Sequence, residues 1–195
     1  LVVGYIASQG DRYLAVYSYA DGELTAILEQ QYEQYLVEDI TGGGSQDLIL
    51  MSTLEDGGVQ IELLTVDRDG LFQQVAAMGL SADKFAGCAS VAAGVGADGK
   101  HYLVLDGWTG ISGNNLATVL LYFDEESQQM VPAPQISTEE LYQDTLRNVP
   151  GLVSRDLDGD GTVEVPTQPD EAGLLNMSQS RRMDFIVWMD YTSPE

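Results

Sequence analysis

The sequence predicts an all-β protein made of four-stranded antiparallel meanders, the units that form the blades of a β-propeller. Asp-Gly turns recur between apolar runs, the runs alternate with the period of two expected of strands, and the strands recur in units of blade size. We expect about four blades, or part of a propeller, in a single domain spanning residues 1–195, with one short inserted helix.

Four Asp-Gly pairs separate apolar runs, and they begin at Asp21, Asp56, Asp69 and Asp98. This dipeptide favours tight hairpins because both central residues of the turn need a positive φ angle. The sequence therefore predicts that strands on either side of these pairs are antiparallel neighbours.

The apolar runs are of two kinds. Val59, Ile61 and Leu63 alternate with polar residues, and Leu24, Ala26 and Leu28 recur with the same period, which predicts strands with one buried face. Residues 116–123 are apolar at nearly every position, as in a strand packed between neighbouring sheets.

The strands also suggest a degenerate internal repeat with insertions. Its units start with strands that follow a loop containing Gly or Asp, at Arg12 to Tyr19, Asp47 to Ser52, His101 to Asp106 and Val163 to Thr167. The second unit is the most regular and predicts four strands, at Tyr35 to Ile40, Asp47 to Leu54, Val59 to Val66 and Leu71 to Met78. Units of about 40 to 50 residues with four strands have the size of propeller blades.

One segment has the pattern of a helix. Ser137 and Glu140 form a capping box, Leu141, Thr145 and Leu146 follow at helical spacing, and Pro150-Gly151 ends the pattern. Residues 168–182 contain Pro, Gly, Asn and Ser without a clear period, which predicts a long loop.

The charge of the chain limits its partners. It has 8 Lys and Arg against 31 Asp and Glu, for a net charge of -23. Such a charge repels nucleic acid phosphates and the anionic inner face of membranes, so we expect no nucleic acid partner. No stretch approaches the roughly 18 apolar residues of a membrane span. The chain starts in a strand-like run at Leu1 without an export signal, so we expect a piece of a longer protein.

Cys88 is the single cysteine and His101 the single histidine. An intrachain disulfide and a thiolate metal cluster are thereby excluded. Small residues surround Cys88, which predicts a buried thiol, and nothing in the sequence brings His101 to it as a catalytic base.

The strongest chemical signal is the acidic loop, which we define as residues 156–164. Carboxylates stand at its positions 1, 3, 5 and 9, as Asp156, Asp158, Asp160 and Glu164, with Gly161 at position 6 and the carbonyl of Thr162 at position 7. Aspartates at alternate positions turn their oxygens toward one centre, which suits a hard cation with six to eight oxygen ligands. Two like charges about 4 Å apart cost about 4 kcal/mol at an effective dielectric constant of about 20, so a divalent cation would relieve the crowding. Calcium fits better than magnesium, which demands strict octahedral geometry.

Two alternatives compete with a calcium loop borne by strands. An EF-hand needs a bidentate Glu at position 12, where this chain has Thr167, and it needs helices on both sides, where this chain has strand-like sequence. The other alternative is an ordinary Asp/Gly turn with solvated charges.

Residues 156–165 resemble the calcium loop of FG-GAP/VCBS-type β-propeller repeats, a family that includes the integrin α-subunit head and many secreted or lipid-anchored bacterial proteins. The resemblance implies that Asp156, Asp158, Asp160 and Glu164 are side-chain ligands of calcium and that Thr162 is a backbone ligand. A weaker copy spans residues 39–47. It keeps Asp39 and Asp47 at positions 1 and 9 but has Thr41 and Gly43 at positions 3 and 5. We expect this copy to be a structural turn.

Other candidate sites are weaker. Glu125-Glu126 and Glu139-Glu140 fit a turn and a helix cap better than a pair of catalytic carboxylates. Trp108 lies in a Gly-rich stretch read as a turn and is the better surface candidate for stacking on a sugar, whereas Trp188 lies in an apolar run that predicts core. Arg181-Arg182 suggests a salt bridge to nearby acid.

Two functions remain open. The first is a non-catalytic extracytoplasmic protein, secreted or anchored at a cell surface, that binds an unknown protein or carbohydrate ligand on a calcium-stabilised propeller. Missing blades or another chain would complete that propeller. The alternative is a carbohydrate-active enzyme, such as a polysaccharide lyase, on a similar scaffold. It predicts a polar cleft with a base and a cation away from Asp156, and fold analogy alone does not decide between the two.

Overall fold

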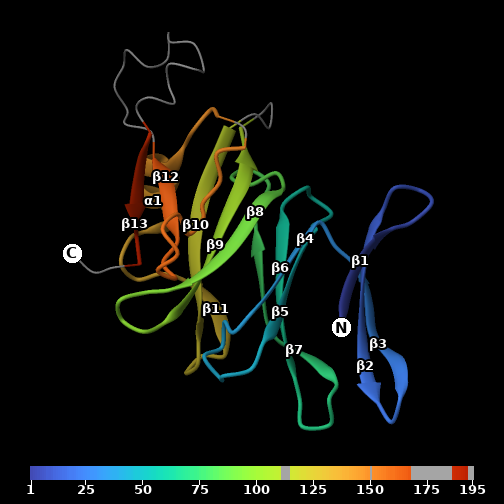
Figure 1. The fold of residues 1–195 in the computed structure, drawn as a ribbon. Coiled ribbons are helices and arrows are strands. Elements are labelled where there is room, and N and C mark those ends of the chain that lie inside the picture. The colour runs from blue at the N-terminus through green and yellow to red at the C-terminus, as the bar shows by residue number, and fades with distance from the viewer. Residues whose placement is uncertain (111–114, 150, 168–185, 193–195) are drawn as a thin grey trace.

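A computed structural model describes residues 1–110, 115–149, 151–167 and 186–192. This part of the chain is all-β, with four antiparallel sheets and one short helix, as the sequence predicts. We number the sheets in chain order. The first sheet has the strand order β1-β2-β3, the second β4-β5-β6-β7, the third β11-β10-β9-β8 and the fourth β12-β13. Figure 1 shows them side by side across the molecule, from the N-terminal first sheet to the fourth.

The elements have the following bounds: β1 Val2–Ile6, β2 Arg12–Ala20, β3 Glu23–Gln31, β4 Gln34–Glu38, β5 Asp47–Thr53, β6 Val59–Val66, β7 Phe72–Leu80, β8 Cys88–Val95, β9 His101–Thr109, β10 Asn115–Asp124, β11 Gln129–Pro132, α1 Thr138–Thr145, β12 Glu164–Thr167 and β13 Val187–Asp190. The predicted four-strand meander of the second unit is confirmed, and the third sheet repeats it. The long loop predicted for residues 168–182 lies outside the described residues.

The Asp-Gly turns are of two kinds. Asp21 and Gly22 both have positive φ angles, of 51° and 87°, as predicted. In the turns at Gly57, Gly70 and Gly99 the glycine has a positive φ but the preceding Asp does not, so the prediction is wrong there. These turns are one residue longer than the turn at Asp21. In the turn that contains Gly57, the N–H of Leu54 donates to the carbonyl of Gly58 at 2.8 Å, and the N–H of Gly57 donates to the carbonyl of Leu54 at 2.9 Å. The turns at Gly70 and Gly99 have the same two hydrogen bonds.

The alternation in β6 is confirmed, with Val59, Ile61 and Leu63 fully buried. The alternation predicted for β3 is wrong, because Leu24 is 57% exposed and Ala26 is exposed as well. A β-bulge explains the difference. Val16 pairs with Leu28, but its neighbour Tyr17 pairs with Ala26. The extra residue moves Ala26 and Leu24 to the outer face of the sheet while Leu28 keeps its place on the inner face.

Three apolar clusters join the sheets in chain order. Leu48 and Leu50 of β5 face Leu14 of the first sheet, whereas Ile49 and Met51 of the same strand face the third sheet. The third sheet is likewise apolar on both faces. Leu103 and Leu105 pack on the second sheet, and Tyr102 and Val104 pack toward α1 and β12. The six central residues of β10, at positions 116–121, are all buried, which confirms the prediction of a strand between sheets.

The directions of the strands relate the first sheet to the second. β3 ends at Gln31 and β4 begins at Gln34, so these two ends lie together. Tyr13 near the start of β2 pairs with Gln31, while Met51 near the end of β5 pairs with Gln34. β2 therefore runs away from this end and β5 runs toward it, so β2 has the direction of β6. The strands β1, β2 and β3 thus follow one another in the same directions as β5, β6 and β7.

The predicted helix and its capping box are confirmed at Ser137 and Glu140. The helix ends at Thr145, earlier than Pro150-Gly151, because Leu146 is extended and Arg147 pairs as a β-bridge with Leu116 of β10. Leu141 and Thr145 face inward and hold α1 against β10. Across the described residues, no helix combines the length and the apolar character that a membrane crossing requires.

Candidate metal centre

The acidic loop stands on a buried base. The backbones of Arg155 and Glu164 exchange two hydrogen bonds of 3.1 Å, which close the loop where β12 begins. Val163 and Val165 at this base are each 1% exposed and pack in the cluster that contains Tyr102 and Val104. The loop is thus fixed at its ends by the core, and its tip projects into solvent.

The acidic loop also lies close to the end of β8. The N–H of Val95 donates to the carbonyl of Gly161, with an N···O distance of 3.0 Å. A Cβ atom at Gly94 would lie 2.9 Å from the same carbonyl oxygen and 3.1 Å from the nitrogen of Val163. Because real Cβ atoms rarely come so near to backbone, glycine at position 94 permits this approach.

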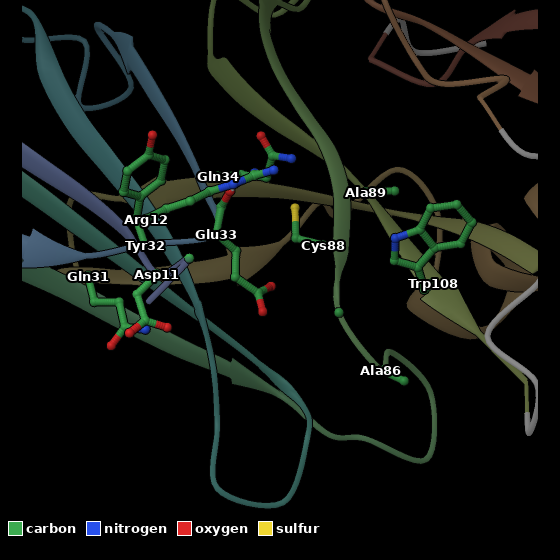
Figure 2. Close-up of a pocket in the computed structure, with 12 residues that line it drawn as sticks. Asp11, Arg12, Gln31, Tyr32, Glu33, Gln34, Ala86, Cys88, Ala89 and Trp108 are labelled. Atoms are coloured by element: carbon green, nitrogen blue, oxygen red, sulfur yellow. The ribbon is translucent and has the colours of Figure 1, made fainter. Parts of the chain in front are cut away.

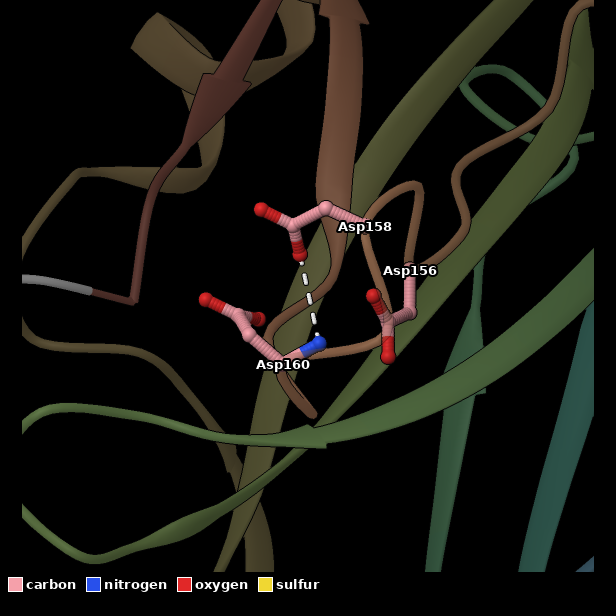
Figure 3. A group of neighbouring side chains, drawn as sticks. All are labelled: Asp156, Asp158 and Asp160. Atoms are coloured by element: carbon pink, nitrogen blue, oxygen red, sulfur yellow. Dashed lines mark hydrogen bonds between the residues drawn. The ribbon is translucent and has the colours of Figure 1, made fainter.

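Asp156, Asp158 and Asp160 are exposed, and one oxygen of each lies within 4.8 Å of the other two (Figure 3). Backbone N–H groups of the loop hold these carboxylates. Asp156 accepts from Gly159 at 2.7 Å and from Gly161 at 3.0 Å. Asp158 accepts from the N–H of Asp160 at 3.2 Å, and Asp160 accepts from the N–H of Thr162 at 2.7 Å. The N–H groups of Gly159 and Gly161 lower the pKa of Asp156 below its ordinary value, so it is ionised at neutral pH.

The structure brings together three of the four predicted carboxylates. Glu164 lies at the base, half-buried, and its Oε2 accepts a 2.9 Å hydrogen bond from the N–H of Leu157. It is outside the cluster formed by the three aspartates. Thr162 is half-buried next to the base, and its N–H is directed to Asp160. One oxygen of Glu164 therefore stabilises the backbone of the loop through a hydrogen bond, whether or not an ion is bound.

The weaker copy at residues 39–47 has the same construction. Its flanking residues Glu38 and Asp47 pair across the strands as Arg155 and Glu164 do. Its position-1 carboxylate, Asp39, accepts from the N–H at position 6, Gly44, at 2.8 Å, as Asp156 accepts from Gly161. Glycines at positions 4 and 6 have positive φ in both loops, with values of 71° and 77° here and 82° and 90° at Gly159 and Gly161.

The position-9 carboxylate is also used alike in both loops. Asp47 is 2% exposed, and its Oδ2 accepts from the N–H groups of Ile40 at 2.9 Å and Thr41 at 2.8 Å. Glu164 accepts from the corresponding N–H of Leu157. The weaker copy is a turn closed by its own hydrogen bonds, and it reaches this backbone without carboxylates at positions 3 and 5.

No basic side chain of the described residues balances the acidic loop. The ion pairs in this part of the chain are Lys84–Glu139 and Arg147–Asp106, and neither involves the three aspartates. A cluster of exposed oxygens without a counter-charge is what a hard divalent cation binds.

The remaining sequence candidates lie elsewhere. Cys88 is 7% exposed, as predicted, and burial raises the pKa of its thiol to about 12, which keeps it protonated and a poor nucleophile. His101 pairs with Val95 at the opposite end of β8 from Cys88, so the two do not meet. Glu140 caps α1 and Glu139 pairs with Lys84, while Glu125-Glu126 lie in an exposed turn.

Both tryptophans differ from their predicted settings. Trp108 lies in β9 and not in a turn, because Asn115 and Leu116 of β10 pair with residues 108–109 and extend the strand. Trp188 is half-buried in β13, where the guanidinium of Arg155 lies 5.5 Å from its ring centroid, rather than fully in the core. Arg181-Arg182 lies outside the described residues.

A cleft that the sequence does not reveal lies between the first, second and third sheets, where β4 and β8 begin (Figure 2). Its lining includes Arg12, Glu33, Gln34 and Trp108. These residues come from segments far apart in the chain, so no local motif announces them. Trp108 alone carried a signal, as an aromatic residue suited to stacking.

No protein-family model matches the chain, and neither does any curated protein sequence.

Proposed function

We propose that this chain is a non-catalytic binding protein whose stack of sheets is a propeller-like scaffold stabilised by calcium in the acidic loop. One observation carries the metal part of the proposal. The loop at residues 39–47 shares with the acidic loop its two positive-φ glycines and the main hydrogen bonds of its position-1 and position-9 carboxylates, yet it has Thr41 and Gly43 where the acidic loop has Asp158 and Asp160.

This comparison separates two roles within the acidic loop. Asp156 and Glu164 hold the backbone, since their counterparts do so in the weaker copy. Asp158 and Asp160 are not needed for that task. Two further negative charges beside Asp156 oppose folding unless something neutralises them, and a divalent cation does so with full oxygen coordination.

Calcium is the cation that fits this site. The residues that would hold it are Asp156, Asp158 and Asp160, with the carbonyl of Thr162 and the second oxygen of Glu164. Calcium accepts such a mixed and irregular oxygen set, whereas magnesium requires near-octahedral geometry and retains its water. A bound ion would offset the repulsion in the loop and strengthen the junction between β8 and β12.

The setting of the loop supports a scaffold role. It lies at the edge of a stack in which the second and third sheets share one topology and are apolar on both faces. The resemblance to FG-GAP/VCBS-type propeller repeats points the same way, and it suggests an extracytoplasmic location, where millimolar calcium would saturate a weak site. A closed propeller needs more equivalent sheets than these, supplied by further blades or by another chain.

The carbohydrate-active enzyme is the second candidate, and the cleft is the observation that favours it. Asp11 and Glu33 supply carboxylates there and Arg12 supplies a cation, all away from the acidic loop. However, Arg12 Nη1 donates to the backbone carbonyl of Glu33 at 3.1 Å, and Glu33 accepts from the hydroxyl of Thr53. These contacts serve structure, and we therefore favour binding without catalysis.

The calcium proposal is tested by the thermal midpoint of unfolding in calcium and in EDTA. Calcium at about 100 times its dissociation constant adds about 2.7 kcal/mol, which corresponds to a rise of roughly 5–10 °C for a domain of this size. The double variant Asp158→Asn/Asp160→Asn should lose this rise and yet, in EDTA, unfold no earlier than the wild-type protein. Magnesium at the same concentration is the control and should give a smaller rise.

Equal midpoints of the wild-type protein in calcium and EDTA would overturn the proposal. The number of calcium ions bound per chain is a second measurement. One oxygen of Asp39 is buried without a partner among the described residues, so calorimetry decides whether the weaker copy takes up an ion. We expect one calcium ion per chain, because positions 3 and 5 of that copy lack carboxylates.

A further inference from the structure

The first sheet repeats three strands of the second sheet in register. Val2 of β1 pairs with Val16 of β2, and a β-bulge follows directly after Val16 in the pairing with β3. Ile49 of β5 pairs with Leu63 of β6, and a β-bulge follows directly after Leu63 in the pairing with β7. β1, β2 and β3 therefore correspond residue by residue to β5, β6 and β7 up to the bulge.

The second and third sheets have one strand more than the first. β4 pairs with β5 and β8 pairs with β9, in both cases antiparallel. The corresponding edge of the first sheet is that of β1, and the described part of the chain places no strand beside it. One strand position is thus filled in two sheets and free in the first.

The free edge of β1 presents unpaired backbone groups. Leu1 and Tyr17 exchange two hydrogen bonds, with N···O distances of 2.9 and 2.8 Å. Because bonded positions alternate along an antiparallel pair, the N–H and C=O groups of Val2, Gly4 and Ile6 point away from β2. These groups have no hydrogen-bond partner among the described residues.

β1 also lacks the features that usually protect an exposed edge. Such strands carry charged residues, proline or a bulge, or are covered by another segment. β1 has the sequence Val-Val-Gly-Tyr-Ile, without charge or proline, and its pairing with β2 is regular. Val3, Tyr5 and Ile6 are 37%, 38% and 70% exposed. An uncharged edge with free ladder groups is suited to pairing with one more strand.

We propose that the edge of β1 binds an uncharged β-strand of a partner protein, which pairs antiparallel as β4 and β8 do. Side chains alternate along such a strand, and those beside Val2 are aliphatic because Val2 packs against the cluster of Leu14 and Val16. A second copy of this chain is disfavoured as the partner, since each copy has a net charge of -23 and the copies repel. The inference rests on the proposed binding function, whose partner class it names.

The probe is a capped peptide with the sequence of β8 and the change Cys88→Ser, because β8 is uncharged and fills this position in the third sheet. The peptide is titrated into isotope-labelled protein, and amide exchange is followed by NMR. We expect saturable binding with a dissociation constant below about 1 mM. At saturation the amides of Gly4 and Ile6 should exchange at least about fivefold more slowly, while amides at the free edge of β3 should not change.

Matched controls in the peptide and in the protein locate the binding. The N–H of Val95 donates to Gly161 and so points away from β9, which means that the N–H of Ala92, three residues earlier, points toward it. A peptide with Ala92→Pro loses this donor and should not bind. In the protein, Ile6→Pro removes an outward donor and should weaken binding at least about threefold. Ile6→Ala keeps the donor and should bind the peptide like the wild-type protein.

Four results overturn the inference. They are no saturable response to the peptide, equal binding of the Ala92→Pro peptide, wild-type affinity in Ile6→Pro, and a dimer of the chain alone that sedimentation detects and Ile6→Pro dissociates. The last result would make a second copy the occupant of the edge. Titrations are run in calcium and in EDTA. Peptide binding without any effect of calcium on the thermal midpoint would remove only the metal part of the proposed function, and the reverse result would remove only this inference.

Discussion

Asp106 and Arg147 form an ion pair inside the protein, each 1% exposed, with an N···O distance of 2.7 Å. The pair is surrounded by partners. Thr118 donates to Asp106 at 2.6 Å, and Arg147 donates to the carbonyls of Thr145 at 2.9 Å and Leu152 at 2.7 Å. Every strong polar group in this network is satisfied, which is the condition under which a buried charge pair is tolerated.

The same network reaches the acidic loop. The backbone N–H of Ser154 donates to Asp106 Oδ2 at 2.5 Å, and its hydroxyl donates to Oδ1 at 2.9 Å. Ser154 lies two residues before Asp156. A single carboxylate in β9 therefore fixes the segment from the end of α1 to the beginning of the loop.

We predict that Asp106→Asn destabilises the protein by about 3–5 kcal/mol, because it leaves the guanidinium of Arg147 buried without a counter-charge. Chemical denaturation measures the change. Glu139→Gln is the matched control, since it breaks the exposed pair with Lys84 and should cost no more than about 1 kcal/mol. A loss of under 1 kcal/mol in Asp106→Asn would show that the pair is dispensable.

Sequence patterns predict some of these features of single residues and miss others. The burial of Cys88 and the capping box at Ser137 follow from their immediate neighbours and are confirmed. The partnership of Asp106 with Arg147 joins residues 41 positions apart, and it depends on the bridge between Leu116 and Arg147. No local pattern encodes such a contact, and in a chain of this composition Asp106 looks like any other acid.

At the scale of elements, the described part of the chain has two loops with the construction of the acidic loop, and each connects antiparallel strand segments. In both, the chain leaves one strand, turns through two glycines with positive φ, and returns to pair with its own start. The sequence indicates this likeness through Asp39 and Asp47. The contact of the acidic loop with the end of β8 is a tertiary feature, and Gly94 gives no sign of it in the sequence.

We predict that Gly94→Ala destabilises the protein by about 1–3 kcal/mol and weakens calcium binding, because the new methyl group would push the carbonyl of Gly161 and the backbone of Val163 away from β8. Denaturation and calcium titration measure the two effects. Gly43→Ala is the control. Its φ is not positive and its Cβ would make an ordinary 3.4 Å contact with Thr41, so both quantities should stay close to wild type. Wild-type calcium affinity in Gly94→Ala would show that calcium binding does not depend on the contact between the acidic loop and β8.

At the scale of the whole molecule, the order of the sheets follows from strands that are apolar on both faces. The continuous apolar run at residues 116–123 predicts a strand between sheets and is confirmed. The correspondence in direction between β1, β2, β3 and β5, β6, β7 is not predictable from alternation or turns, because it depends on how the sheets stack. The cleft was equally hidden, since it exists only where three sheets meet. The propeller stays a prediction.

Stability of the whole chain should fall at both ends of the pH scale. Backbone and side-chain hydrogen bonds lower the pKa of Asp67, Asp124 and Asp156, so their contribution is present above the ordinary carboxyl pKa and is lost as the pH falls below about 4. Burial raises the pKa of Tyr102, Tyr191 and Cys88 to about 12. Their contribution is complete below the ordinary values of about 8.5 to 10 and is lost as the pH rises toward 12.

The thermal midpoint in EDTA from pH 3 to pH 11 should therefore form a plateau with two falling limbs. Repulsion among the excess carboxylates of a chain with a net charge of -23 also lowers the midpoint at neutral and alkaline pH. Salt separates the two causes. At about 1 M salt the screening length is about 3 Å, so general repulsion fades and the plateau rises, while the alkaline limb persists because desolvation of buried hydroxyl and thiol groups is not screened. An alkaline limb that disappears in salt would assign it to net charge and not to Tyr102, Tyr191 and Cys88.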